Sequence, residues 1–207
     1  MVTAVNLFEN SVGQNLPEGF GWLNEPEEWG FDSNGRLTVA APAKADFFAD
    51  PAGLPAVRSA PFLFKTLEGD FTVSTRMEVK MQTECDSACL MVMADDGNWG
   101  KICYENSYQI PSIVSVVTRG VSDDCNGEGS RAYCPTLRIT RAGDAFAFHY
   151  SFDAKFWRLK RYFSFGFAPG AVRVGVVVQS PMGEGCTAGF DCFDYLPGAV
   201  EDLRSGI

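Results

Sequence analysis

"ACLMVMADDGNWGKICYEN", residues 88–106, holds two apolar runs that are separated by Asp96 and Gly97. Each run has the length of one strand, and an Asp-Gly pair favours the tight turn that joins two antiparallel strands. The stretch therefore predicts a β-hairpin. Its second strand carries Trp99, Lys101 and Glu105 at alternate positions, so all three are expected on one face of a sheet.

The same alternation of apolar and polar residues recurs along the chain, and no long segment has a helical period. Gly143-Asp144 and Pro169-Gly170 supply further turns. Many short strands with this punctuation predict an all-β antiparallel sandwich or barrel. The predicted strands cover residues 35–41, 61–67, 70–81, 88–95, 101–106, 113–120, 136–143, 145–153, 156–163, 171–181 and 186–196.

Length and composition favour a single domain. The chain has 207 residues, 46% of them hydrophobic and 13% aromatic, which is ample for one core. We expect one domain over residues 1–207, with a core of about 20–196 and a mobile tail over 197–207. The aromatic stretch 19–32 is expected to pack as an irregular segment.

The charge and the N-terminal sequence limit the partners and the compartment. A net charge of −9 disfavours binding to nucleic acid or to anionic membrane surfaces. The first residues lack a basic segment followed by a long apolar run, which is the mark of a secretory signal. The most apolar stretch, 172–181, is too short to span a bilayer. The simplest expectation is a cytoplasmic protein.

The cysteines and the acidic loop indicate no cofactor. Seven cysteines, an odd number without a CxxC pair, favour reduced thiols over disulfides or zinc. Asp124, Asn126, Glu128 and Gly129 follow the opening spacing of a calcium loop, but its twelfth position is Pro135 where a glutamate is needed. We therefore predict no metal site, and we interpret the loop as a solvated acidic turn.

Hydrolytic chemistry finds little support in the carboxylates. A retaining glycosidase needs two carboxyl groups about 5 Å apart, and no strand offers a run of alternating acids. Glu78 is flanked on its face by Arg76 and Lys80, and Glu105 lies near Lys101. Such pairing lowers a carboxyl pKa and does not suit a general acid. We predict no catalytic residue. A cross-strand pair of Glu78 and Glu105 would restore the hypothesis of a hydrolase.

The single histidine, His149, leaves a second enzymatic alternative open. A polysaccharide lyase needs a base such as His149 and an arginine clamp such as Arg119 or Arg76. The alternative is a hydrogen-bonded sheet residue, which is the commoner fate of a polar side chain. Alternation points His149 away from the core side of its strand, which carries Phe146 and Phe148.

Several stretches together resemble a known family. They are "DFFADP" (46–51), "SAP" (59–61), "GDFTVSTRMEV" (69–79), "DDGNWGKICYE" (95–105), "SVVTRGVSDD" (115–124), "RITRAGDAFAFHYSFD" (138–153) followed by Trp157, and "VGVVVQSPMGEG" (174–185). In this order they are similar to the concanavalin A-like family that contains YesU-type proteins and the yeast regulation-of-enolase protein. The resemblance implies a jelly-roll sandwich of two antiparallel sheets, one of them concave, and carbohydrate as the ligand by analogy.

The polar strand faces and this resemblance lead to one main hypothesis. The protein is expected to bind a small polar ligand, a saccharide or sugar acid, on the concave sheet. Trp99 is expected to be partly exposed and to stack on a sugar ring. The alternatives are a carbohydrate-active enzyme, hydrolase or lyase, and a regulatory protein that acts through a protein partner. The candidate ligand-binding residues are Trp99, Lys101, Glu105, Arg119, His149, Gln179, Arg76, Glu78 and Phe48.

Overall fold

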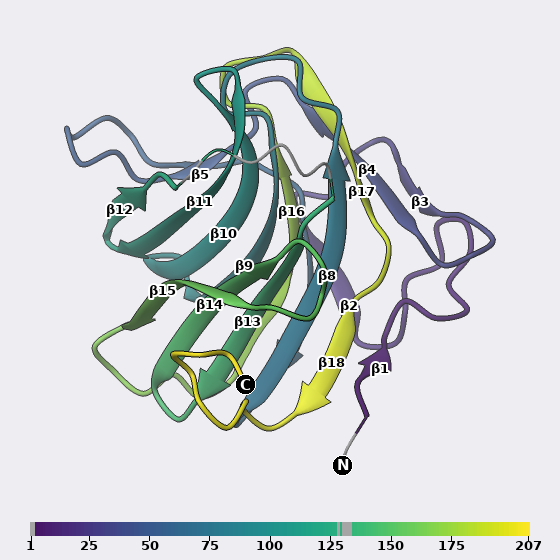
Figure 1. Cartoon of the computed structure of the whole chain (residues 1–207). Helices are drawn as coiled ribbons and strands as arrows, with labels where there is room; N and C mark the ends of the chain where they lie inside the picture. Colours follow the sequence, from purple (N-terminus) through teal and green to yellow (C-terminus); the bar gives the residue numbers. More distant parts are fainter. Residues whose placement is uncertain (1–2, 128, 130–133) are drawn as a thin grey trace.

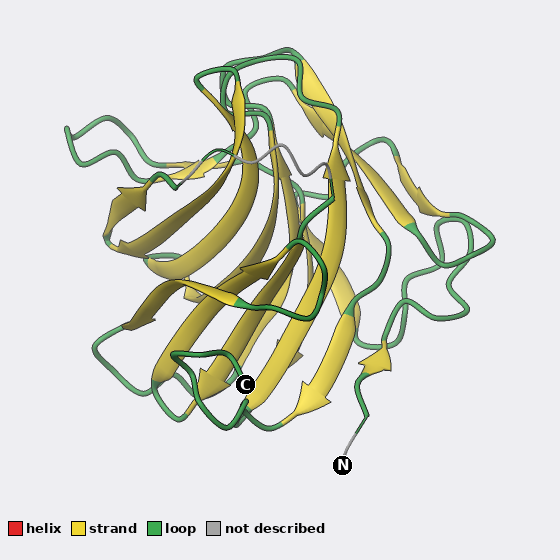
Figure 2. Cartoon of the chain, viewed as in Figure 1, coloured by secondary structure: helices red, strands yellow, loops and turns green. Residues whose placement is uncertain are grey.

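The computed structural model describes residues 3–127, 129 and 134–207. Two large antiparallel sheets pack face to face, and Figure 2 shows strands and loops but no helix in this part of the chain. The predicted all-β sandwich of concanavalin A-like architecture is therefore confirmed. Among the described residues no helix is long and apolar enough to cross a membrane.

One sheet has seven strands, and the predicted hairpin lies near its middle (Figure 1). In spatial order the strands are β12 (Val121–Cys125), β11 (Ile110–Arg119), β10 (Asn98–Ser107), β9 (Ser87–Asp95), β16 (Val172–Gln179), β7 (Phe62–Leu67) and β2 (Phe20–Leu23).

The second sheet has nine strands. Its main path is β15 (Arg158–Ser164), β14 (Ala145–Ser151), β13 (Thr136–Ala142), β8 (Phe71–Val79), β17 (Gly185–Phe190), β4 (Leu37–Pro42) and β3 (Trp29–Phe31), and β18 (Asp194–Pro197) pairs with β8 and with β1 (Val5–Asn6). The strand predicted over 186–196 is thus two strands. Both pair with β8, β17 with its second half and β18 with its first.

The β9–β10 hairpin forms as predicted. The Gly97 amide donates to Asp95 Oδ1 at 2.8 Å, which closes the turn. Gly100 faces the second sheet, and a Cβ there would lie 2.9 Å from the Phe163 ring and 3.0 Å from the Phe148 ring. This glycine therefore lets the two sheets approach closely, while its neighbour Lys101 points to the other face of the sheet.

A short separate hairpin covers part of that outer face. It consists of β5 (Phe47–Phe48) and β6 (Val57–Arg58). Its Phe47 ring packs against the Trp99 ring of β10 with the centroids 5.9 Å apart. The Ala49 amide next to it donates to Ser122 Oγ of β12 at 2.9 Å. The outer face of the seven-stranded sheet is therefore roofed at this end.

Candidate functional site

Three polar side chains form a row on the outer face of the seven-stranded sheet. The register pairs Glu105 of β10 with Ser87 of β9, and Ser87 with Gln179 of β16. Gln179 Nε2 donates to Ser87 Oγ at 3.3 Å. Lys101 lies four residues before Glu105 on the same face, and its long side chain extends toward Gln179.

Lys101 has several polar partners on this face. Its ammonium donates to the Phe47 carbonyl oxygen and to Gln179 Oε1, both at 2.8 Å, and lies 3.5 Å from Asp46 Oδ1. It is 2% exposed, and Nζ lies 5.7 Å from the centre of the Trp99 ring. Two hydrogen bonds and one ion pair with the protein thus hold an ammonium group that has three donors.

The charge of Lys101 is held by its surroundings. Burial is the largest single influence and lowers the pKa of the ammonium, but Asp46, Cys103, Cys89 and Glu105 together outweigh it, and the pKa is raised. Lys101 therefore stays protonated at any physiological pH, and its hydrogen bonds tie the β5–β6 hairpin to the sheet. This lysine has a structural role at the base of the site.

A cavity of about 220 Å³ opens beside this cation. Charged and apolar side chains share its wall, a mixture typical of small-molecule sites. The lining residues are Asp46, Phe48, Cys85, Lys101, Glu105, Val114, Val116, Asp124, Gln179, Pro181 and Met182. We call it the β10 cavity.

Glu105 is the group of the β10 cavity that is free to react. It is half-buried, and in the described part of the chain no hydrogen bond or ion pair within 4.0 Å reaches its carboxylate. Burial raises the pKa of the Glu105 carboxyl to about 7, helped by the negative charge of Asp124 and opposed by Lys101. Near neutral pH it therefore exists in both forms, as a hydrogen-bond donor and as an acceptor.

Cys85 also lines the cavity but is not reactive. Burial raises the pKa of its thiol to about 12, and the charge of Glu105 acts in the same direction. Since the thiolate is the nucleophile, a thiol with this pKa is inert at neutral pH. All seven cysteines are free thiols in the structure.

Trp99 corrects one expectation. The prediction that it is partly exposed is wrong, because it is 1% exposed beneath the Phe47 ring. Alternation placed it on the outer face as anticipated, but the β5–β6 hairpin covers that end of the face. A stacking surface for a ligand is instead offered by Phe48, which lines the cavity.

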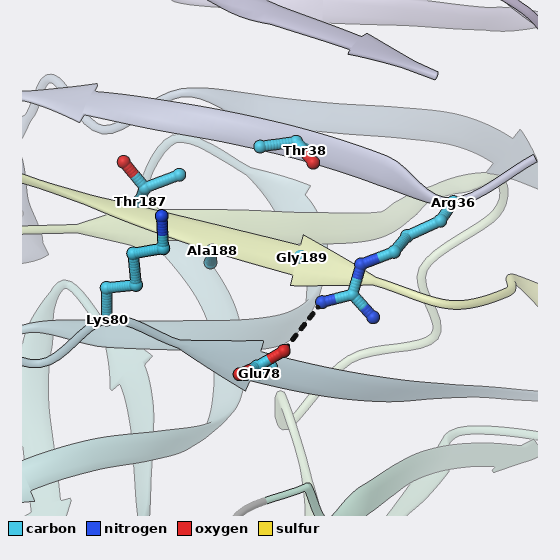
Figure 3. A pocket seen from close by; sticks show the side chains of 7 residues that line it. All are labelled: Arg36, Thr38, Glu78, Lys80, Thr187, Ala188 and Gly189. Atoms are coloured by element: carbon cyan, nitrogen blue, oxygen red, sulfur yellow. Dashed lines mark hydrogen bonds and ion pairs between the residues drawn. The ribbon is translucent and has the colours of Figure 1, made fainter. Parts of the chain in front are cut away.

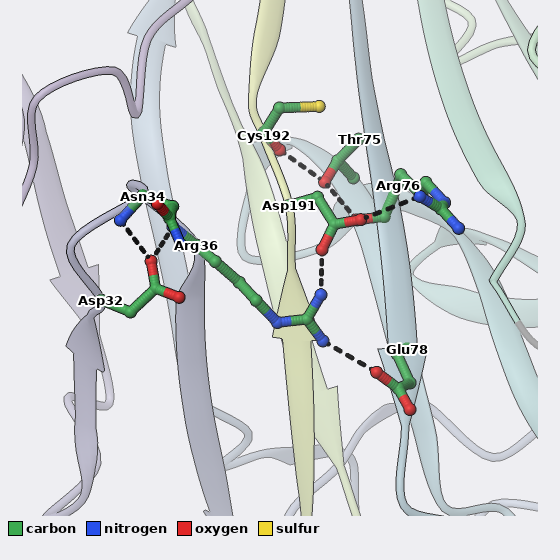
Figure 4. A network of polar contacts seen from close by, with 8 residues as sticks. All are labelled: Asp32, Asn34, Arg36, Thr75, Arg76, Glu78, Asp191 and Cys192. Carbon is green, nitrogen blue, oxygen red and sulfur yellow. Dashed lines mark hydrogen bonds and ion pairs between the residues drawn. The ribbon is translucent and has the colours of Figure 1, made fainter.

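Arg76 and Glu78 lie on the other sheet, on β8, and do not approach Lys101 or Glu105. Figure 4 shows them in a network in which Arg36 binds both Glu78 and Asp191, and Arg76 binds the second oxygen of Asp191 at 3.5 Å. The expected convergence is wrong because β8 and β10 belong to different sheets. The pairing of Glu78 with Glu105 is excluded for the same reason.

This network borders a second cavity of about 220 Å³, which Figure 3 shows between Arg36, Glu78 and Lys80. The network's carboxylates are paired with arginines, and its side chains are 32% to 56% exposed. Exposed ion pairs of this kind contribute little energy and leave no acid free for proton transfer. The β10 cavity is therefore the stronger candidate.

Arg119 and His149 are also remote from the β10 cavity. Arg119 ends β11 and donates from Nε to the Ser164 carbonyl oxygen at 2.9 Å. His149 lies on β14 of the nine-stranded sheet and is 0% exposed. It faces away from the core as predicted, but the C-terminal residues, which were expected to be mobile, pack over it. Of the nine candidates, Lys101, Glu105, Gln179 and Phe48 lie together.

Two acids of the cavity were not among the predicted ligand-binding residues. Asp46 precedes Phe47 in a loop whose approach to Lys101 has no local signal, and Asp124 was considered only for calcium. Glu128 of that calcium motif lies outside the described residues. In the part of the chain that is described, no three His, Cys, Asp or Glu side chains are grouped to hold a metal.

The chain is similar to a protein and to a crystal structure from Saccharomyces cerevisiae. It is 31% identical over 141 residues to "Regulation of enolase protein 1", which covers 68% of this chain and 71% of that protein. A crystal structure of a functionally unknown protein from the same organism superposes with a TM-score of 0.80 at 28% identity, over 89% of this chain and 98% of that one.

More distant structures share the fold alone. The GH43 protein BlXynB from Bacillus licheniformis has a TM-score of 0.74 at 15% identity, over 94% of this chain and 39% of that one. Lectin I-B4 from Griffonia simplicifolia has a TM-score of 0.58 at 11% identity, over 93% and 98%. The family model described as "Protein of unknown function (DUF1349)" matches residues 22–197. The chain belongs to the DUF1349 family.

Proposed function

We propose that the β10 cavity binds a small neutral polyhydroxyl compound such as a saccharide. The observation that carries this proposal is Glu105, a half-buried carboxyl at the cavity wall with no hydrogen-bond partner among the described residues. A half-buried carboxyl without a protein partner bonds to solvent, and a ligand hydroxyl that replaces this water is a natural partner for it. Phe48 and Val114 of the same wall suit the C–H faces of a sugar ring.

The charges around the cavity favour a neutral ligand over a sugar acid. The positive charge of Lys101 is balanced by Asp46 at 3.5 Å. Glu105 and Asp124 then add negative charge to the wall. A ligand carboxylate would be repelled by both, and its approach would raise the pKa of Glu105 further.

The relatives support this proposal by analogy only. Among the structures with this fold are GH43 proteins and a lectin. A shared fold does not transfer a ligand, so the argument rests on the cavity.

Calorimetric titration of glucose, xylose and glucuronate into the full chain tests the proposal. We expect saturable binding of a neutral sugar, weaker binding of glucuronate, and at least about tenfold weaker sugar binding in Glu105→Gln, since one charged hydrogen bond contributes about 1.5–3 kcal/mol. Glu68→Gln, at an exposed glutamate, is the matched control. Absence of saturable binding by any neutral sugar at 100 mM, on the order of the weakest useful affinity, contradicts the proposal.

The second candidate is a carbohydrate-active enzyme, hydrolase or lyase. The specific observation is the pKa of Glu105, raised to about 7 next to Asp124 and Asp46. A carboxyl that keeps its proton near neutral pH is suited to general acid catalysis, with a neighbouring carboxylate as its partner. Release of nitrophenol from aryl glycosides, abolished in Glu105→Gln, would establish it.

A regulatory role through a protein partner is the third candidate. The hairpin that covers the cavity has exposed apolar residues, Leu54 in its connecting loop, 67% exposed, and Val57 on β6, 38% exposed. Leu54→Ser would weaken capture of such a partner and leave sugar titrations unchanged. The name of the yeast relative suggests enolase as the first protein to test.

A further inference from the structure

A compact turn formed by residues 202–207 covers the outer face of β13 and β14 (Figure 1). The Asp202 carboxylate accepts from the backbone amides of Arg204 at 2.9 Å and Ser205 at 3.2 Å. The Gly206 amide donates to the Asp202 carbonyl oxygen at 2.8 Å. These bonds all lie within the turn, which we call the cover.

Beneath the cover lie Arg138 and His149, which are directly opposite each other on β13 and β14. Arg138 is 7% exposed and His149 0%. Arg138 Nη2 donates to the Gly206 carbonyl oxygen at 2.7 Å, and His149 Nε2 lies 3.0 Å from the Leu203 carbonyl oxygen. Since a carbonyl only accepts, His149 carries its proton on Nε2. Two backbone carbonyls of the cover thus bind two buried donors.

Arg138 and His149 each have one side-chain nitrogen that is free to form a further hydrogen bond. Arg138 Nε and His149 Nδ1 have no hydrogen-bond partner among the described residues. No carboxylate of this part of the chain lies within 4.0 Å of the Arg138 guanidinium. Its other contact is the Trp157 ring, at 3.9 Å from the centroid. A buried cation without a counter-ion costs several kcal/mol, so its presence calls for an explanation.

Gly206 fits this place because it has no side chain. A Cβ on it would lie 2.5 Å from Arg138 Nη2 and 3.0 Å from His149 Cδ2. Its φ of +79° is also a conformation that favours glycine. The backbone of the cover therefore contacts Arg138 and His149 directly. Its carbonyl oxygens lie at hydrogen-bond distance from both side chains, where a small ligand would bind.

We propose that Arg138, His149 and Trp157 form a second binding site, for a small oxyanion, and that the cover occupies it with its carbonyl oxygens. A carboxylate or phosphate supplies the negative charge that Arg138 lacks and accepts from Nη2 together with the unused Nε. His149 Nε2 donates a further hydrogen bond. The Trp157 ring fixes the guanidinium plane. The ligand replaces the cover, so the site is available when the cover swings away.

The single histidine of the chain provides the readout. The His149 ring gives one set of NMR signals, which are followed in the full chain while acetate or phosphate is added at constant ionic strength. Gly206→Val pushes the cover off by collision, and Asp202→Ala removes the acceptor that shapes it without adding bulk. In both variants we expect a saturable shift at anion concentrations on the order of tenfold below those needed in wild type. The acetate and phosphate series show which oxyanion the site prefers.

The pKa of His149 reports independently whether the site has opened. Burial lowers it to about 4, and the positive charge of Arg138 on β13 acts in the same direction, whereas Asp202 of the cover opposes them. Opening admits water, so the pKa rises toward about 6.5. A value that stays near 4 in both variants overturns the role of the cover.

The charge requirement is tested in the Gly206→Val background. Arg138→Gln should abolish the anion-dependent shift. Arg173→Gln is the matched control, because Arg173 also stacks on an aromatic ring, Phe64 at 5.2 Å, but on the other sheet. It should leave the shift intact. Absence of a saturable shift in both opened variants, or a shift that survives Arg138→Gln, overturns the proposal.

Discussion

Lys101 and Arg138 are two buried cations on the outer faces of different sheets, and each is covered by a segment from elsewhere in the chain. Lys101 has two hydrogen-bond acceptors at 2.8 Å and a carboxylate at 3.5 Å. Arg138 has one backbone carbonyl at 2.7 Å and, in the described residues, no carboxylate within 4.0 Å. The fold therefore gives Lys101 a full set of polar partners, whereas it gives Arg138 only part of one.

The difference indicates different roles for the two covers. The β5–β6 hairpin is fixed by Lys101 and leaves a free acid, Glu105, at the edge of a cavity. The turn over 202–207 is held by few bonds and leaves free donor and acceptor atoms beneath it. A buried group that is fully paired stabilises the fold, whereas an incompletely paired one is a candidate for binding.

The largest expected effect is that of Lys101→Met. The substitution leaves the Asp46 carboxylate, the Phe47 carbonyl and the Gln179 amide oxygen without their shared donor. Breaking a buried pair from one side costs about 3–5 kcal/mol. We expect a loss of that size in the free energy of unfolding, measured by urea denaturation.

Lys65→Met is the matched control for this measurement. Lys65 also donates to a carbonyl oxygen, that of Glu18 at 2.7 Å, and lies 5.6 Å from the Phe20 ring, but it is half-buried. Its replacement should cost about 1 kcal/mol or less. Equal losses of unfolding free energy in the two variants would show that Lys101 contributes no more to stability than an ordinary half-buried lysine.

Glu105→Gln is expected to stabilise the protein, with a dependence on pH. The pKa of Glu105 is raised from its usual 4.5 to about 7, so the folded chain binds more protons than the unfolded one between these values. The free energy of unfolding therefore falls as pH rises from about 4.5 to 7, and stays lowered above pH 7. Removing the acid should raise it by about 1–3 kcal/mol at pH 8 and change it little at pH 4.5.

Denaturation of wild type, Glu105→Gln and Glu68→Gln at both pH values measures this effect. Glu68 is exposed and should show no such difference. A Glu105→Gln variant that is less stable than wild type at pH 8 would mean that the carboxylate has a stabilising partner. Glu105 would then have a structural role, and the proposal that it pairs with a ligand would be contradicted.

Arg138→Met should have the smallest effect. Methionine keeps a long side chain against the Trp157 ring and removes a buried charge that lacks a counter-ion, but it loses the bond to the Gly206 carbonyl. These terms oppose each other, so the free energy of unfolding should change by about 1 kcal/mol or less. A loss of stability as large as that of Lys101→Met would show that Arg138 is as well paired as Lys101. The two buried cations would then not differ in role.

Much of the fold was predictable because its signals are local. The Asp96-Gly97 turn and the flanking apolar runs form the β9–β10 hairpin, and alternation assigned the inner side of β8 correctly. Irregular pairing was not predictable. The run 186–196 divides between two strands, whose shared partner β8 lies far away in sequence. The aromatic segment 19–32 contains β2, which pairs with the distant β7, and β3, which pairs with the nearby β4.

The sequence by itself determined which residues are polar, which alternate and which face of its own strand each side chain occupies. It therefore placed Lys101, Glu105 and Gln179 on polar faces. Only the tertiary structure decided which strands share a sheet, and so separated Arg76 and Glu78 from Glu105. It also decided what covers each face, because the approach of Phe47 to Trp99, or of Gly206 to Arg138, depends on packing between distant segments. A period of two residues fixes a direction, whereas burial depends on what arrives from elsewhere in the chain.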